Sequence, residues 1–298
     1  MSAPPVIAES LPPDDGRSPL AARVRTIVLF VVAALVVFVI IFPFLWILLS
    51  SFKDPDNFLS LHLGDAIPTT PTLGSYRLAI DDTSLLRWIG NSLVVAVATT
   101  LLSLLICAPA AFAFARLRFH GRGVASTLLV FAYAIPSITL AVPLFIVLVK
   151  LGLNDTYIGL VIVHASFTIP FVTWVLTDFY RSIPIDLEAA GYVDGASLVR
   201  VLRHIILPLS LPGLLAAGAY AFILSWNDFL FAFVIMNSDE HYTAPVGISA
   251  YFAGQNVTQE VWAQLMSASV LVTLPSVILF GFFQRYIVSG FLAGAVKG

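Results

Sequence analysis

The sequence predicts an all-α integral membrane protein with six transmembrane helices. Hydrophobic residues make up 59% of its 298 residues, charged residues make up 11%, and the mean hydropathy is +0.96. An ordinary soluble domain has about 45–50% apolar and about 25% charged residues. About 20 consecutive apolar residues cross a bilayer as a helix. Runs of that order recur along the chain: Ile27–Leu49, Ile89–Phe114, Val124–Val149, Tyr157–Tyr180, Leu211–Met236 and Ala263–Ile287.

The first apolar run is predicted to be an uncleaved span. Three arginines precede it, as in a signal peptide, but the run exceeds the about 7–15 residues of a cleavable apolar region. Residues 1–26 are then a cytoplasmic N-terminal tail. Its Pro-rich, acidic stretch up to Pro19 cannot bury a core and is expected to be disordered.

The other runs are also predicted to be helices, because backbone groups in lipid must be bonded internally and none of the runs alternates with period two over a barrel-length segment. Prolines within the runs are expected to kink them. These prolines are Pro43, Pro109, Pro136, Pro143, Pro170 and Pro275. The polar segment Ser51–Arg87 is expected to be an ordered loop or a short-helix region rather than a domain.

The basic residues predict the orientation, since cytoplasmic segments carry an excess of Lys and Arg. With the N-terminus inside, eleven basic residues lie inside: Arg17, Arg23, Arg25, Arg116, Arg118, Arg122, Arg181, Arg200, Arg203, Arg285 and Lys297. Only four lie outside: Lys53, Arg77, Arg87 and Lys150. Both termini are therefore predicted to be cytoplasmic.

Composition also argues against a nucleic-acid partner, an internal disulfide and a metal site. The net charge of −2 indicates no nucleic-acid partner. The lone cysteine, Cys107, excludes an internal disulfide, and we interpret it as a small packing residue. The five histidines lack ligand spacing, so no metal site is expected.

A polar insert separates the fourth run from the fifth, where about 2–8 residues would suffice for a plain helical hairpin. A short helix is expected to start with Ser182 or Ile183 at its cap and Pro184 in its first turn, and to run to about Tyr192. Asp194-Gly195 is expected to break it, since glycine tolerates a positive φ. The economical reason for such an insert is a docking surface for another protein.

A second helix is expected after the break. Its apolar residues recur at spacings of three and four, so the helix is amphipathic and is expected to lie at the membrane surface or against a partner. The stripe consists of Leu198, Val201, Leu202, Ile205 and Ile206. Pro208 and Pro212 follow it, before the fifth span.

The order Ile-Pro, Leu, Glu188-Ala189-Ala190, Asp194-Gly195-Ala196 and Ile205-x-Leu-Pro208 resembles the cytoplasmic "EAA" loop of type I ABC importer permeases. Other stretches resemble the carbohydrate-uptake branch of these permeases, which includes the MalG subunit of the maltose transporter. They are Ser51-Phe52-Lys53, Pro136 with Pro143, Trp226-Asn227-Asp228-Phe229, Ala244-Pro245-Val246-Gly247, Gln284-Arg285-Tyr286 and Gly294-Ala295-Val296-Lys297-Gly298. The resemblance extends from Ile27 to the end of the chain.

This resemblance implies a type I ABC importer fold. The transmembrane domain is then residues 27–291 with a core at about 85–287, and residues 292–298 are a cytoplasmic tail. Glu188, Ala189, Ala190, Asp194, Gly195 and Ala196 are then the coupling helix, which docks into a groove on a cytoplasmic ATPase. Leu187 stands where many members carry a second acidic residue, so Glu188 is expected to be the sole glutamate that contacts the ATPase.

The resemblance also implies the partners: a second permease subunit in a heterodimer, two copies of the ATPase, an extracytoplasmic sugar-binding protein and the lipid of a prokaryotic cell membrane. The chain has no Gly-x-x-x-x-Gly-Lys-Ser/Thr motif. It is therefore expected not to be an enzyme and to bind no cofactor itself, with ATP and Mg²⁺ on the separate ATPase. The imported sugar stays open among disaccharides, oligosaccharides, sugar alcohols and glycerol-phosphate compounds.

Asp228 is the notable charge in an apolar run. It lies about 26 Å along a core about 30 Å thick, which places it near the outer surface. One interpretation makes Asp228 and Asn227 a polar lining at the outer mouth of the substrate path, with the Trp226 indole stacked on a sugar face. The other is an interfacial helix end, with Trp226 in the aromatic belt. His164 either faces the path or is a hydrogen-bonded packing histidine, and the second reading is favoured.

Two rival functions differ in the residues that they need. An ion-coupled secondary transporter needs buried acidic or histidine relays near mid-membrane and no ATPase dock. This chain offers His164 as a candidate relay, and it has the dock. A membrane enzyme needs clustered catalytic groups, which the sequence does not show.

Overall fold

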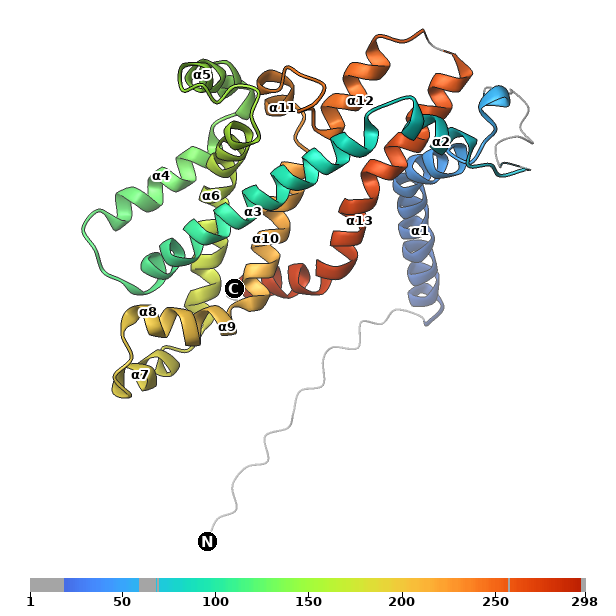
Figure 1. Cartoon of the computed structure of the whole chain (residues 1–298). Helices are drawn as coiled ribbons and strands as arrows, with labels where there is room; N and C mark the ends of the chain where they lie inside the picture. The colour runs from blue at the N-terminus through green and yellow to red at the C-terminus, as the bar shows by residue number, and fades with distance from the viewer. Residues whose placement is uncertain (1–18, 59–67, 69, 257, 296–298) are drawn as a thin grey trace. The chain divides into compact units, whose positions relative to one another are not determined.

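The computed structural model describes residues 19–58, 68, 70–256 and 258–295, and this part of the chain is helical, without a strand. Figure 1 shows the helices. Their bounds are α1 Pro19–Ser50, α2 Gly74–Asp81, α3 Leu85–Arg116, α4 Arg122–Ala134, α5 Ser137–Lys150, α6 Tyr157–Ser182, α7 Asp186–Val193, α8 Leu198–Val201, α9 Leu207–Leu209, α10 Leu211–Trp226, α11 Leu230–Ile235, α12 Ala244–Ala253 and α13 Gln259–Ala295. A 3-10 turn at Pro55–Asn57 and a π-helical turn at Leu202–Ile206 complete the set.

The chain divides into two compact units, residues 1–48 and 49–298. Helix α1 makes up the described part of the first. It begins at Pro19, earlier than the predicted span at Ile27, and its large apolar side chains are exposed, as with Phe30 at 74%. An exposed helix this apolar requires lipid or a partner around it. The predicted disordered tail up to residue 18 lies outside the described residues.

Helices α3, α6 and α10 form the centre of the second unit (Figure 1). One cluster joins Phe112 of α3, Leu176 and Tyr180 of α6, and Ala217 and Ala221 of α10, all of them buried. The small residues let the helix backbones approach closely, as is typical of packing in membranes.

A polar contact reinforces the packing of α3 against α6. The hydroxyls of Ser103 and Thr168 lie 2.6 Å apart and are buried. In lipid, a buried hydroxyl without a partner is costly, so such pairs favour one register of the two helices.

Two predicted spans are broken rather than continuous. The third run divides at Ile135-Pro136 into α4 and α5, which are bent by 100°. Ile135 has an extended backbone, as the residue before a proline prefers. The fifth run divides at Asn227-Asp228-Phe229 into α10 and α11. A second bend, of 78°, separates the segment Leu198–Leu209 from α10.

The remaining prolines in the predicted spans behave differently. Pro43, Pro109, Pro143, Pro170 and Pro275 all lie inside continuous helices. A proline therefore ends a span here only at Pro136. Sequence spacing alone does not separate that position from the others.

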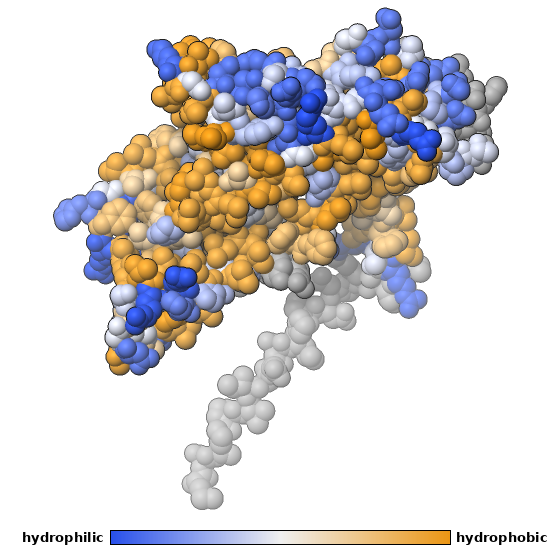
Figure 2. Space-filling model, viewed as in Figure 1, coloured by the Kyte–Doolittle hydropathy of each residue, from blue (hydrophilic) through white to orange (hydrophobic). Residues whose placement is uncertain are grey.

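In the described part of the chain, four helices are long and apolar enough to cross a membrane, or up to six if each bent pair is one span. The apolar surface extends over the helices between two more polar ends (Figure 2). This arrangement agrees with the predicted type I importer fold and with six spans as its upper count.

Polar contacts attach the segment between α11 and α12 to the start of α3. The carboxylate of Asp239 accepts hydrogen bonds from Arg87 and from the indole of Trp88. The amide of Asn91 donates to the carbonyl oxygens of Glu240 and Tyr242, both at 2.8 Å. The segment that follows α11 is thereby attached to the start of α3.

Two segments between the longer helices contain short helices. The predicted loop or short-helix region 51–87 contains α2 in its described part. The segment between α11 and α13 contains α12. A Cβ on Gly247 of α12 would lie 2.1 Å from the Trp88 ring, so only glycine permits this close approach.

Candidate coupling loop and translocation path

Helix α7 starts later than expected. Helix α6 runs through Ser182, and α7 begins at Asp186 with Ile185 at its cap, so the predicted cap at Ser182 or Ile183 is wrong. Pro184 lies before the helix rather than in its first turn. The expected charge pattern is present, because Asp186 and Glu188 occupy the first turn, where the helix dipole favours acidic side chains.

The end of α7 is closed by a left-handed glycine, as predicted. Gly195 has φ +79°, and its amide donates to the Tyr192 carbonyl at 3.0 Å. The Ala196 amide donates to the Gly191 carbonyl at 2.9 Å. This pair of bonds is the Schellman motif, which satisfies carbonyls at a helix C-terminus.

Helix α7 and the segment that follows it lie in close contact. A Cβ on Gly191 would lie 2.7 Å from Cδ1 of Ile205 and 3.5 Å from Cγ2 of Val201. Glycine at this position therefore lets the two halves of the insert pack directly on each other.

The second half of the insert packs on the chain's own helices. Val201 and Ile206 are fully buried in the cluster with Phe112 and Tyr180. Four residues of the expected amphipathic stripe therefore pack against the chain's own helices, whereas Leu198 is 40% exposed. A π-helical turn at Leu202–Ile206 precedes Pro208, and because proline lacks an N–H and crowds the carbonyl four residues earlier, it favours such a widened turn.

Glu188 points inward. Its carboxylate Oε1 lies 2.5 Å from Nε of Arg116, the last residue of α3, and the two side chains are 3% and 11% exposed. Arg116 also donates from Nη2 to the Ile183 carbonyl at 2.7 Å. In this structure the carboxylate attaches the insert to α3, and its contact with an ATPase stays a prediction.

The outer face of the insert is exposed. Ala189, Ala190, Asp194 and Gly195 are exposed, and Ala196 is half-buried. Large apolar side chains stand out beside them, with Val193 at 88% exposure. They are Ile185, Leu187, Tyr192, Val193 and Val199. A cluster of exposed apolar side chains on a polar insert is typical of a protein-binding surface.

Two of the four residues predicted for the substrate path are buried among the chain's own helices. Trp226 is 2% exposed, stacks on Phe222 and donates from its indole to the Val272 carbonyl, so its ring has no free face for a sugar. His164 is 1% exposed, as expected for a packing histidine. Neither side chain is open to a path in this structure, and the assignment of both to the substrate path stays a prediction. Asn227 is exposed and Asp228 half-buried.

His164 and Asp228 meet at the break between α10 and α11. Nε2 of His164 lies 3.0 Å from Oδ2 of Asp228, and Nδ1 lies 2.7 Å from the Ser225 hydroxyl. The Asp228 carboxylate also accepts the amide of Ala232 at 3.0 Å. The aspartate thus caps α11 and lies against α6, and it holds the two broken segments in one arrangement.

We expect Asp228→Ala to lower transport without preventing assembly. The variant removes the α11 cap, worth about 0.5–2 kcal/mol, and leaves His164 without its carboxylate neighbour. Uptake by the reconstituted complex should fall about tenfold, while size-exclusion chromatography shows an intact complex. Thr127→Ala, which removes only an exposed bond to the Gly123 carbonyl, is the matched control. Full transport by Asp228→Ala would show that Asp228 lies at a helix end and has no role in transport.

Arg116 was missed as a site residue by the sequence reading. It was counted only as one of the inside charges, and its partner lies 72 positions further along the chain. The helix dipole favours a basic residue in the last turn of a helix, but the position of the arginine in the sequence does not identify the acidic residue that it binds.

The chain matches known proteins over most of its length. A family model described as "Binding-protein-dependent transport system inner membrane component" matches residues 105–292. The trehalose/maltose transport system permease protein MalG of Thermococcus litoralis is 35% identical over 277 residues, which cover 92% of this chain and 98% of the relative. The trehalose transport system permease protein SugB of Mycobacterium tuberculosis is 35% identical over 268 residues, covering 90% and 96%.

A solved structure shares the fold. It is a bacterial ABC transporter involved in the import of the acidic polysaccharide alginate, with a TM-score of 0.80 and 21% identity, over 91% of this chain and 99% of that chain. The family match, the full-length relatives and the shared fold agree with the insert described above. This chain belongs to the family of inner membrane components of binding-protein-dependent transport systems.

Proposed function

We propose that this chain is one of two membrane subunits of an ATP-driven, binding-protein-dependent importer of a carbohydrate. Several relatives carry sugar names: besides the two permeases above, a diacetylchitobiose uptake permease is 30% identical over 268 residues. The observation that carries the proposal is the insert, whose inner face is packed and ion-paired to the spans while its outer face exposes apolar side chains. Such a surface suits a soluble partner under the membrane.

The other components supply what this chain lacks. A second permease completes the heterodimer, an external sugar-binding protein delivers the substrate, and two copies of a cytoplasmic ATPase bind ATP and Mg²⁺. No phosphate-cradling motif is present in the sequence, so hydrolysis belongs to the ATPase rather than to this subunit.

The mechanism follows from how the insert is attached. ATP-driven closure of the ATPases pushes on the exposed face of α7. The Glu188–Arg116 pair and the buried Val201 and Ile206 transmit the displacement to α3 and α6. Because a packed core is not continuously deformable, the spans rock between inward-facing and outward-facing arrangements.

The proposed topology places both termini inside, on the eleven-to-four asymmetry of basic residues. A cysteine introduced at Asp56, in a chain whose buried Cys107 is unreactive, should react with an impermeant maleimide from outside. A cysteine at Gly121, between α3 and α4, should not. The reverse pattern would contradict the orientation.

The assembled complex tests the proposal directly. The chain is expressed with its partner permease and ATPase, purified, and reconstituted into vesicles. Labelled disaccharide should accumulate only with the binding protein outside and ATP on the ATPase side. Uptake that needs an ion gradient and no ATP would support a secondary transporter instead. Failure of the ATPase to co-purify would contradict the proposal that the insert binds an ATPase.

A further inference from the structure

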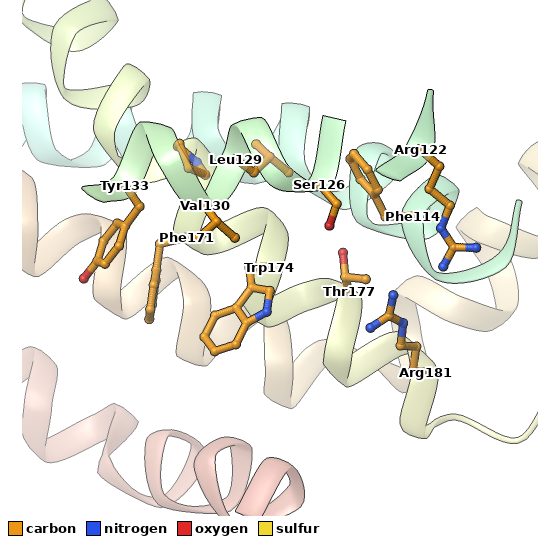
Figure 3. Close-up of a pocket in the computed structure, with 11 residues that line it drawn as sticks. Phe114, Arg122, Ser126, Leu129, Val130, Tyr133, Phe171, Trp174, Thr177 and Arg181 are labelled. Carbon is orange, nitrogen blue, oxygen red and sulfur yellow. The ribbon is translucent and has the colours of Figure 1, made fainter. Parts of the chain in front are cut away.

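A pocket of about 360 Å³ lies between α4 and α6, away from the residues predicted for the substrate path. Figure 3 shows its lining, with Tyr133 and Phe171 at one end, and Arg122, Arg181 and the Phe114 ring at the other. Its volume falls within the about 300–1,000 Å³ of small-ligand sites, which combine an apolar, aromatic lining with a few polar groups.

The aromatic end is a set of rings that pack on one another. Tyr133 of α4 and Phe171 of α6 are stacked, with centroids 5.5 Å apart and planes at 29°. Trp174 lies 6.1 Å from Phe171, and Tyr220 of α10 backs Phe171 at 4.1 Å. Tyr133 and Trp174 are 58% and 56% exposed, so these large rings are fixed by neighbours yet open to the pocket.

The polar end offers hydrogen-bonding groups. Ser126 and Thr177 face each other from α4 and α6, and Arg122 and Arg181 lie beside them (Figure 3). Thr177 donates its hydroxyl to the Thr173 carbonyl, which leaves its oxygen free to accept. Arg181 uses one nitrogen on Asp178, at 3.0 Å, and a guanidinium has five N–H donors.

We propose that this pocket is a carbohydrate-contact site on the inner half of the transport route, which rests on the proposed function and deepens it. Sugars present flat C–H faces that stack on aromatic rings and a periphery of hydroxyls that bind arginine and hydroxyl side chains. Tyr133, Phe171 and Trp174 lie toward one end of the pocket and both arginines toward the other (Figure 3). Tyr133 lies two residues before Ile135, so this aromatic end adjoins the point where the span divides.

The test uses the full reconstituted complex with a sugar that the wild type imports. Trp174→Leu and Tyr133→Leu should each lower the maximal uptake rate at least tenfold. The half-saturating sugar concentration, which the binding protein sets, should stay unchanged, as should ATPase stimulation by the loaded binding protein. Trp174→Phe, which keeps a ring, should recover most of the rate.

A matched control comes from the same helix. Phe131 of α4 is 64% exposed but does not line the pocket, so Phe131→Leu should transport normally. An equal loss of uptake in Phe131→Leu and Tyr133→Leu, or normal uptake by Trp174→Leu, would overturn the proposed sugar contact. Neither result would contradict the proposed import function. Absence of ATP-dependent uptake by the wild type would instead overturn the proposed function.

A lipid headgroup bound at the arginines is the competing occupant. Arg122→Gln and Trp174→Leu are therefore compared in vesicles of neutral lipid and in vesicles containing anionic phospholipid. A defect of the same size in both vesicles supports the sugar site. A defect that appears only with anionic lipid would show that the pocket holds lipid, and would overturn the proposal.

Discussion

Glu188→Ala is expected to abolish uptake and to weaken the association with the ATPase. The side chain is 3% exposed and pairs with Arg116, which is itself 11% exposed. Removing one partner of a buried ion pair leaves the other charge uncompensated, at about 3–5 kcal/mol. The insert then loses its direct link to α3, so displacement of α7 no longer reaches the spans. Uptake, ATPase co-purification and sugar binding by the isolated binding protein are measured together, and the last should not change.

The partner residue provides the decisive control. Arg116→Ala should reproduce the defect, and the double variant should be no worse than either single one, because both remove the same interaction. Asp186→Ala, in the same first turn but exposed, should be nearly silent. If Glu188→Ala is inactive while Arg116→Ala transports normally, the carboxylate acts on the ATPase and not through α3.

Gly195→Pro is expected to remove coupling by disrupting the turn after α7. Gly195 has φ +79°, whereas proline holds φ near −65°, and the change also removes the amide bond to the Tyr192 carbonyl. The cost is about 1–3 kcal/mol. A Cβ at Gly195 would meet nothing within 4 Å, so no side-chain clash of the Cβ contributes to the effect. Uptake should be lost and ATPase association weakened in a membrane-inserted chain.

Graded substitutions separate backbone strain from side-chain contact at this turn. Gly195→Asn should retain most uptake, since asparagine visits the left-handed region, and Gly195→Ala should be intermediate at about 1–2 kcal/mol. Equal activity of all three variants would mean that the turn after α7 transmits nothing. Loss in Gly195→Asn equal to that in Gly195→Pro would point to direct contact with the ATPase at this site.

Local signals predicted the membrane class and the site of the insert. A span needs only a long enough apolar run, and a left-handed turn needs glycine, so both can be read from neighbouring residues. The turn at Gly195 and the helix before it accordingly appear close to where the sequence places them. The break at Pro136 was predicted only as a kink. Its sequence context does not distinguish it from the five other prolines in similar runs, which lie inside continuous helices.

The sequence by itself determined the helical membrane fold, the two-part insert and its glycine turn, because hydropathy and φ preferences act over a few residues. Tertiary structure alone decided that Glu188 turns inward to Arg116 and that Trp226 and His164 are buried. It also decided that Tyr133, Phe171 and Trp174 line one pocket. These outcomes depend on which helix faces meet. Many pairings satisfy the same apolar runs, so the choice among them rests on close packing and on polar partners far apart in the chain.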